Sequence, residues 1–113
     1  MTKATTVDRP VYFHPDYTAC DYAFDTTRKS AEIARSLEAH PLSSVTLTRP
    51  TPSVVRRTRE LVGALHCPDY VRAVRTGDDL QLAESQGFRW DSDIYRMAVA
   101  HNGGVVAATD AVL

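Results

Sequence analysis

The sequence has few of the features that mark a secreted or membrane-embedded protein. Its 113 residues include two cysteines, Cys20 and Cys67, which lie far apart with no motif around them. Such cysteines are typical of reduced thiols in a cytoplasmic protein rather than of a disulfide framework. The first ten residues are polar and lack the apolar stretch of a secretory signal. We therefore expect a cytoplasmic protein.

Long apolar runs and an excess of one charge are also missing. No apolar run approaches the roughly 20 residues that cross a bilayer, so we expect no membrane partner. The formal net charge is -1, which predicts no overall attraction to nucleic acid or to an anionic membrane. The hydrophobic fraction of 43% is too high for a disordered chain, so one small folded domain is expected.

Motifs of common catalytic sites are absent as well. The sequence has no nucleophile elbow, no phosphate-binding loop and no dinucleotide fingerprint. A zinc site needs three or four closely placed ligands, and the four histidines are neither adjacent nor four residues apart. We interpret the close pairs His14/Asp16 and His66/Cys67 as structural. His101 falls on the apolar face of its helix, which favours a buried, hydrogen-bonded histidine.

The pattern that is present predicts a mixed α/β fold. Residues 11–14 and 44–48 are short and β-favouring, and we expect the first of these strands to be buried. The residues between 15 and 25 form an aromatic and acidic loop. Capping residues and apolar spacing predict helices over about 27–39, over 54–65 with Ser53 as its cap, from Pro68 to Thr76-Gly77, and over 80–86.

The last stretch predicts one long helix that runs to Leu113 and is capped by Asp91, Ser92 or Asp93. Gly103 and Gly104 lie inside it, and each costs about 1 kcal/mol of helix propensity relative to alanine. We expect another backbone to approach closely there. The helix has no stop signal, and two strands are too few for a complete sheet. Both features predict an incomplete domain.

Five segments, taken in order, resemble the N-terminal part of the histone deacetylase superfamily, which includes bacterial acetylpolyamine amidohydrolases and acetoin-utilisation-type proteins. The segments are 11–14, 23–29, 66–71, 82–91 and 102–108. The resemblance implies an arginase/deacetylase-type three-layer α/β fold with a parallel sheet between helices. Residues 11–113 would be its helix-rich N-terminal portion, with few strands, and residues 1–10 a flexible N-terminus.

The resemblance also implies an activity for the full domain, the zinc-dependent hydrolysis of acetyl-lysine or acetylpolyamine amides. The family's zinc ligands, histidine pair and oxyanion tyrosine all follow the Gly-Gly helix, so no catalytic or metal residue is carried over. We expect no cofactor in this chain and no activity of the chain alone. The resemblance instead implies a substrate rim built from two loops, with Tyr17, Tyr22, Phe24, Asp25, Trp90, Asp91 and Asp93 as candidates.

Two other functions remain open at this point. The chain could be a stand-alone interaction module that self-associates or docks on a full-length relative through uncovered apolar faces. It could also bind nucleic acid through its arginines, although the near-neutral charge disfavours this interpretation. The arginines concerned are Arg56, Arg57, Arg59, Arg72 and Arg75.

Overall fold

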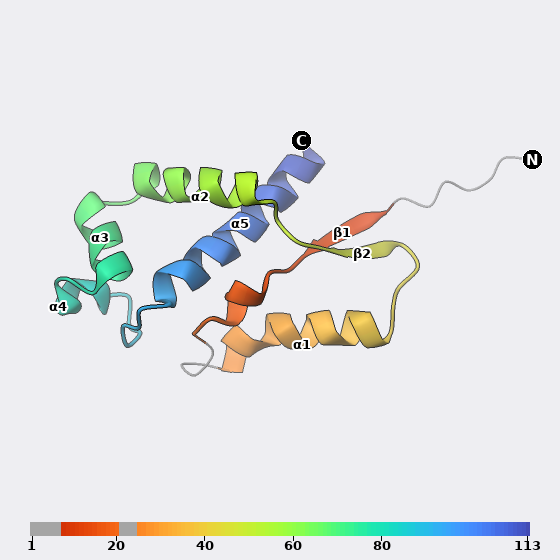
Figure 1. The fold of residues 1–113 in the computed structure, drawn as a ribbon, viewed down its shortest axis with the longest axis horizontal. Coiled ribbons are helices and arrows are strands. Elements are labelled where there is room, and N and C mark those ends of the chain that lie inside the picture. The colour runs from red at the N-terminus through yellow and green to blue at the C-terminus, as the bar shows by residue number, and fades with distance from the viewer. Residues whose placement is uncertain (1–7, 21–24) are drawn as a thin grey trace, which may run out of the picture.

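The structure, a computed structural model, describes residues 8–20 and 25–113. Within these residues the chain forms two strands and a larger number of helices (Figure 1), so the expected mixed α/β class is confirmed. The elements are β1 (Arg9–Tyr12), the 3-10 helix η1 (Pro15–Thr18), α1 (Asp25–Ala39), β2 (Val45–Thr48), α2 (Pro52–Leu65), α3 (Pro68–Thr76), α4 (Leu80–Ala83) and α5 (Ile94–Val112).

The two strands form a parallel pair, with Arg9 opposite Val45 and Tyr12 opposite Thr48. Parallel neighbours need a crossover connection, and α1 lies in that connection. The first strand differs from the prediction because it begins at Arg9 and ends before Phe13. It is also not fully buried, since Arg9 and Pro10 are exposed. The expected buried strand over 11–14 is therefore wrong.

The early end of β1 has a local cause. His14 is the N-cap of η1, and its ring Nδ1 accepts a hydrogen bond from the Asp16 amide at 3.0 Å. Pro15 occupies the first turn of η1, where its fixed φ and missing N–H are tolerated. Residues 15–18, which we predicted to be part of a loop, therefore form the 3-10 helix η1 shortly after the strand ends.

Local signals set most helix ends. Pro68 opens α3, and Gly77 ends it in the left-handed region at φ 79°, as the sequence predicts. At the start of α2, however, the cap is Thr51, whose hydroxyl accepts a hydrogen bond from the Val54 amide at 3.2 Å. The expected cap Ser53 was wrong because Pro52 already takes the first helical position. Helix α4 is shorter than predicted and ends at Ala83.

Helix α5 is the central element of the fold. It packs against α2, α3, η1 and β1, and Figure 1 shows it between α2 and the segment that holds η1. Its buried face includes Val99, Gly103 and Gly104. The predicted close approach is found at Gly104, but the Tyr17 side chain makes it rather than another backbone. A Cβ at Gly104 would overlap the Tyr17 hydroxyl and lie 2.9 Å from its ring Cζ.

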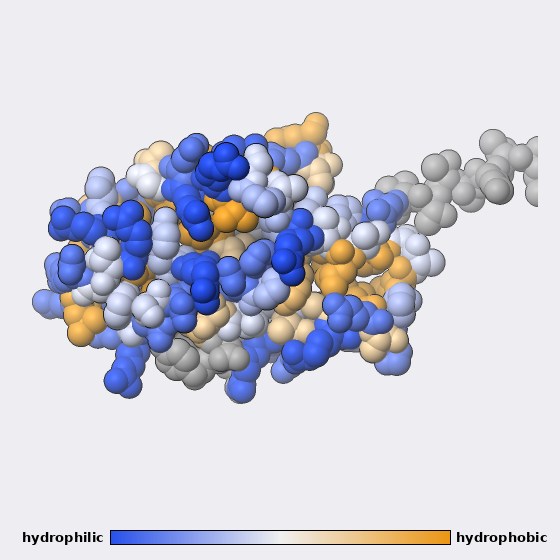
Figure 2. Space-filling model, in the orientation of Figure 1, coloured by the Kyte–Doolittle hydropathy of each residue, from blue (hydrophilic) through white to orange (hydrophobic). Residues whose placement is uncertain are grey.

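The buried side chains are mostly small, whereas several large apolar side chains are exposed. Thr58 is the largest side chain that is fully buried. By contrast, Leu65 is 77% exposed and Val112 is 82% exposed. Figure 2 shows apolar side chains gathered at the C-terminal end of α5 and around the two strands. Parallel sheets are usually covered by helices on both faces, so these surfaces are incompletely covered in the described residues.

No helix in residues 8–20 and 25–113 combines the length and the hydropathy needed to cross a membrane.

Candidate functional site

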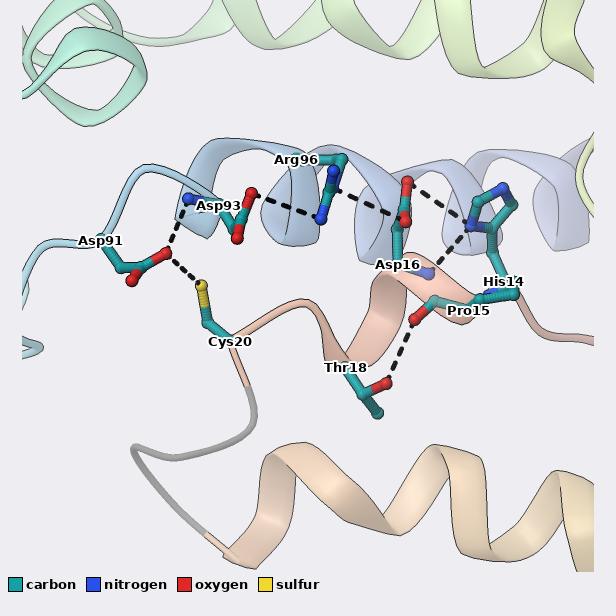
Figure 3. Close-up of polar contacts among 8 residues, drawn as sticks. All are labelled: His14, Pro15, Asp16, Thr18, Cys20, Asp91, Asp93 and Arg96. Atoms are coloured by element: carbon teal, nitrogen blue, oxygen red, sulfur yellow. Dashed lines mark hydrogen bonds and ion pairs between the residues drawn. The ribbon is translucent and has the colours of Figure 1, made fainter.

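Two segments that are far apart in the sequence meet at the N-terminal end of α5. One is residues 14–20, which contain η1, and the other is residues 90–96, which lead into α5 (Figure 3). These are the described parts of the two predicted rim loops. We call this group of side chains, His14, Asp16, Cys20, Asp91, Asp93 and Arg96, the polar cluster.

Trp90 fixes the entry into α5. Its indole Nε1–H donates to the Val74 carbonyl at 2.8 Å, and its backbone N–H donates to a carboxylate oxygen of Glu84 at 2.7 Å. Its ring lies over Gly77, where a Cβ would come within 2.7 Å of the ring. Trp90 is therefore an anchor that ties α5 to the end of α3, and its ring is half-buried rather than projecting from a rim.

Asp91 joins the two segments. One of its carboxylate oxygens accepts the Cys20 thiol at 3.3 Å and the Asp93 backbone N–H at 2.7 Å. The second hydrogen bond satisfies an amide at the helix start, a task that capping side chains commonly perform. Asp93 is the N-cap by position but makes no side-chain capping bond. Of the three proposed capping residues, Asp93 therefore takes the cap position, and Asp91 hydrogen-bonds its amide.

Asp93 and Asp16 hold Arg96 between them. The guanidinium Nη2 lies 3.3 Å from Asp93, and Nε lies 3.6 Å from Asp16. The three side chains are between one third and about half exposed, so each pair contributes at most about 1 kcal/mol to stability. The arrangement orients Arg96 and keeps 46% of the Asp93 side chain accessible to solvent.

Cys20 is not set up as a nucleophile. The thiol is buried, and its burial, with the neighbouring Asp91, raises the pKa of Cys20 to about 12. The thiolate is the reactive form, and a cysteine with a raised pKa is protonated at neutral pH. Cys67 is exposed and forms no disulfide with Cys20. Both thiols are free, as the sequence predicts.

Tyr17, the first rim candidate, is a core residue. Its side chain is 7% exposed, and burial raises the pKa of its hydroxyl. The ring stacks on His101 with centroids 4.6 Å apart and meets Phe13 edge-on at 5.6 Å. His101 Nε2 also lies 2.8 Å from the Tyr17 carbonyl. The histidine is hydrogen-bonded as expected, but it is exposed rather than buried.

Three further rim candidates belong to the end of the first loop. Tyr22 and Phe24 lie outside the described residues. Asp25 is the first residue of α1.

Across residues 8–20 and 25–113, no three His, Cys, Asp or Glu side chains come together in a group that could hold a metal ion. In the polar cluster, Arg96 lies between the carboxylates of Asp93 and Asp16, and the Cys20 thiol donates its hydrogen bond to Asp91.

Two of the arginines considered for nucleic-acid binding pair with acidic side chains. Arg57 forms an ion pair with Asp110, and Arg72 lies 4.0 Å from Asp69. Arg59 instead faces a small hollow that it shares with Arg96 and His14. A second, apolar groove lies between α2, α3 and α5 and has a volume of about 190 Å³. Neither hollow was predicted, because each depends on helix packing.

Comparison with protein-family models, with curated proteins and with solved structures found no match for this chain.

Proposed function

We propose that this chain supplies the N-terminal part of a zinc-dependent deacetylase-type α/β domain. In this proposal the chain contributes two loops to the rim of the substrate pocket, and the zinc site is built by residues of the same domain beyond Leu113. The proposal starts from the resemblance of the five sequence segments. The substrates would be amides of acetylated lysine side chains or of acetylated polyamines.

One observation carries the proposal, which is the contact between Cys20 and Asp91. The two residues are 71 positions apart, yet their side chains are hydrogen-bonded at 3.3 Å. They belong to the two loops that the resemblance assigns to the pocket rim. A rim requires that these two loops lie side by side at one end of the domain, and this contact supports that arrangement.

Among the rim candidates, Asp93 is best suited to contact a substrate. Nearly half of its side chain is exposed, and Arg96 holds one of its oxygens. A carboxylate has several acceptor positions, so Asp93 can accept a further hydrogen bond from a peptide or ammonium N–H. Trp90 and Tyr17 would instead support the rim from below, since one anchors α5 and the other fills the space beside Gly104.

The uncovered apolar surface is the second support for the proposal. The two-stranded parallel sheet and the exposed Val105 and Val112 are surfaces that further strands and helices of a three-layer domain would bury. The chain alone should then have no deacetylase activity. An acetyl-lysine peptide assay with added zinc checks this expectation, and zinc-dependent turnover would contradict it.

The gene itself offers the sharper test. The transcript should be sequenced beyond the Leu113 codon. If the proposal holds, an in-frame continuation encodes a histidine pair and then the two aspartates and the histidine of the zinc site. A continuation that folds as a domain without these motifs would contradict the deacetylase assignment.

A stand-alone interaction module is the second candidate function. It is favoured by the apolar end of α5, where Val112 is 82% exposed and Leu113 is 97% exposed. If the transcript stops after Leu113, this function gains support. On sizing, a module should then give a monodisperse oligomer, whereas an incomplete domain should give a mixture of monomer and soluble aggregate.

A further inference from the structure

A small hollow lies where both parallel strands end. His14 follows β1 and Pro50 follows β2, and both line the hollow. Its other walls come from α2 and α5, which contribute Arg59 and Arg96. The volume is about 40 Å³. The carboxyl edge of a parallel sheet is the usual place for ligand binding in open α/β folds. The hollow therefore lies where such folds bind ligands.

The lining carries a net positive charge. Two arginines and one aspartate, Asp16, face the hollow, so the formal sum is +2 and -1, which gives +1. The Asp16 carboxylate already lies near Arg96 at 3.6 Å and near the His14 ring. Arg59 has no hydrogen bond or ion pair with any described residue. Its guanidinium therefore offers up to five N–H donors to a ligand.

The second arginine is held in position before any ligand arrives. Asp16 contacts Arg96 at Nε, and Asp93 contacts it at Nη2, so the guanidinium is fixed from two sides (Figure 3). A fixed guanidinium loses less conformational entropy on binding than a mobile one. Arg96 is thus pre-organised, while Arg59 supplies the uncompensated charge.

His14 adds a ring N–H donor to the same hollow. Its Nδ1 accepts the Asp16 amide hydrogen at 3.0 Å, so in the neutral ring the proton is on Nε2. The walls between these polar groups are apolar, with Val55 from α2 and Val99 from α5. Apolar walls lower the local dielectric constant and strengthen a charge-assisted hydrogen bond.

We propose that this hollow binds one small oxyanion, a phosphate or a carboxylate group, through Arg59 with Arg96 and His14 as additional donors. Both oxyanions match the fork of a guanidinium. At about 40 Å³ the hollow is the size of one such group. This inference does not rest on the proposed deacetylase function, because it uses neither zinc nor Asp91 and Trp90, although Arg96 is held by the rim candidate Asp93.

The test is a titration of the 113-residue chain with sodium phosphate, and separately with sodium acetate, at constant ionic strength set with sodium chloride. NMR follows the amide signals of residues around the hollow, including Asp16 and Val99. We expect saturable shifts with a dissociation constant on the order of 1 mM, equivalent to about -4 kcal/mol. Tighter binding of phosphate would identify a phosphate group as the ligand chemistry, and tighter binding of acetate a carboxylate.

Three variants separate a specific site from general charge attraction. Arg59→Gln should weaken binding of the preferred anion at least tenfold, and Arg59→Lys should weaken it less because the charge remains. Arg56→Gln is the matched control, since Arg56 is exposed on the same helix but does not line the hollow. It should change the affinity less than twofold. Non-saturable shifts, or equal loss of affinity in Arg56→Gln and Arg59→Gln, would overturn the proposal.

Discussion

The first part of α5 and its C-terminal end both carry apolar side chains, but these side chains differ in exposure. In the first part of the helix, Val99 is 3% exposed and Ile94 is 7% exposed. Farther along, Val105 is 66% exposed and Val112 is 82% exposed. The N-terminal part is enclosed by η1, α2 and α3, and the loop that precedes it is anchored by Trp90. The C-terminal end extends beyond that enclosure (Figure 1).

This difference shows that burial on α5 depends on its neighbours rather than on its own hydropathy. Tyr17 and Thr58 reach the N-terminal part at Gly104 and Gly103, where small residues allow close packing. At the other end the polar contact is the exposed ion pair between Arg57 and Asp110. Such pairs add little stability. The first part of α5 is therefore enclosed by its neighbours, whereas Val105 and Val112 farther along the helix are exposed.

The largest effect is expected at Gly77, which supports the Trp90 anchor. In Gly77→Ala the residue would have to keep φ at 79°, and its Cβ would come within 2.7–2.9 Å of the Trp90 ring. Left-handed strain and overpacking together should lower the free energy of unfolding by about 2–4 kcal/mol. Urea denaturation followed by tryptophan fluorescence measures this loss.

Gly63→Ala is the matched control for that variant. Gly63 lies inside α2, and a Cβ added there would have no neighbouring atom within 4 Å, so alanine meets open space. Better helix propensity should stabilise the protein by about 1 kcal/mol. If both substitutions had the same effect, the anchoring role of the Gly77–Trp90 contact would be wrong.

A second test compares the neighbouring glycines of α5. Gly104→Ala should destabilise the fold by about 1–3 kcal/mol, because the buried Tyr17 ring cannot turn away without leaving His101 and Phe13. At Gly103 the nearest atom is the Thr58 hydroxyl at 3.7 Å, an ordinary contact. Gly103→Ala should therefore be neutral or stabilising. Thermal melts of the two variants give the comparison, and equal melting temperatures would contradict it.

The third test makes the same substitution, valine to alanine, at a buried position and at an exposed position of α5. Val99→Ala should cost about 2 kcal/mol, since two buried methyl groups are lost. Val105→Ala should stay within about 0.5 kcal/mol, because the side chain is already exposed. Equal losses in chemical denaturation would show that the C-terminal end of α5 is covered in solution, for example by a second copy of the chain.

The last prediction concerns the reactivity of the two thiols, which has the smallest effect on stability at neutral pH. Cys67 should react with iodoacetamide at pH 8, whereas Cys20 should stay unlabelled in the folded protein because its pKa is about 12. The protonated form is favoured by folding, so the stabilisation is complete below the ordinary pKa of 9.0 and is lost as the pH rises toward 12. Mass spectrometry of labelled peptides shows whether Cys67 reacts and Cys20 does not. Rapid labelling of Cys20 would contradict its burial.

The parts of the fold that follow from local chemistry were predictable from the sequence. Pro68 and Gly77 mark the two ends of α3, since one fits the first helical turn and the other the left-handed end. The mixed α/β class, with a helix in the connection between the two strands, also follows from two β-favouring segments that flank a helix. The strand limits at Arg9 and Tyr12 were missed, because the His14 cap depends on a ring rotamer that sequence patterns do not encode.

The candidate site was predictable only in outline. The two loops were proposed as a rim from the sequence, but their contact joins Cys20 to Asp91 across 71 positions, and spacing alone carries no such information. The same holds for Tyr17, which the sequence places in a loop and the structure places against Gly104. The Gly-Gly pair did signal a close approach. The identity of the approaching group depends on how η1 and α5 are arranged in space.

Our central claim is that this chain contributes a rim and no metal site. The most direct measurement is the zinc content of the purified 113-residue chain after incubation with zinc and removal of unbound metal. We expect no retained zinc. One tightly bound zinc per chain, lost when His14, His66, Cys20 or Cys67 is replaced by alanine, would contradict the claim and would place a metal centre within these residues.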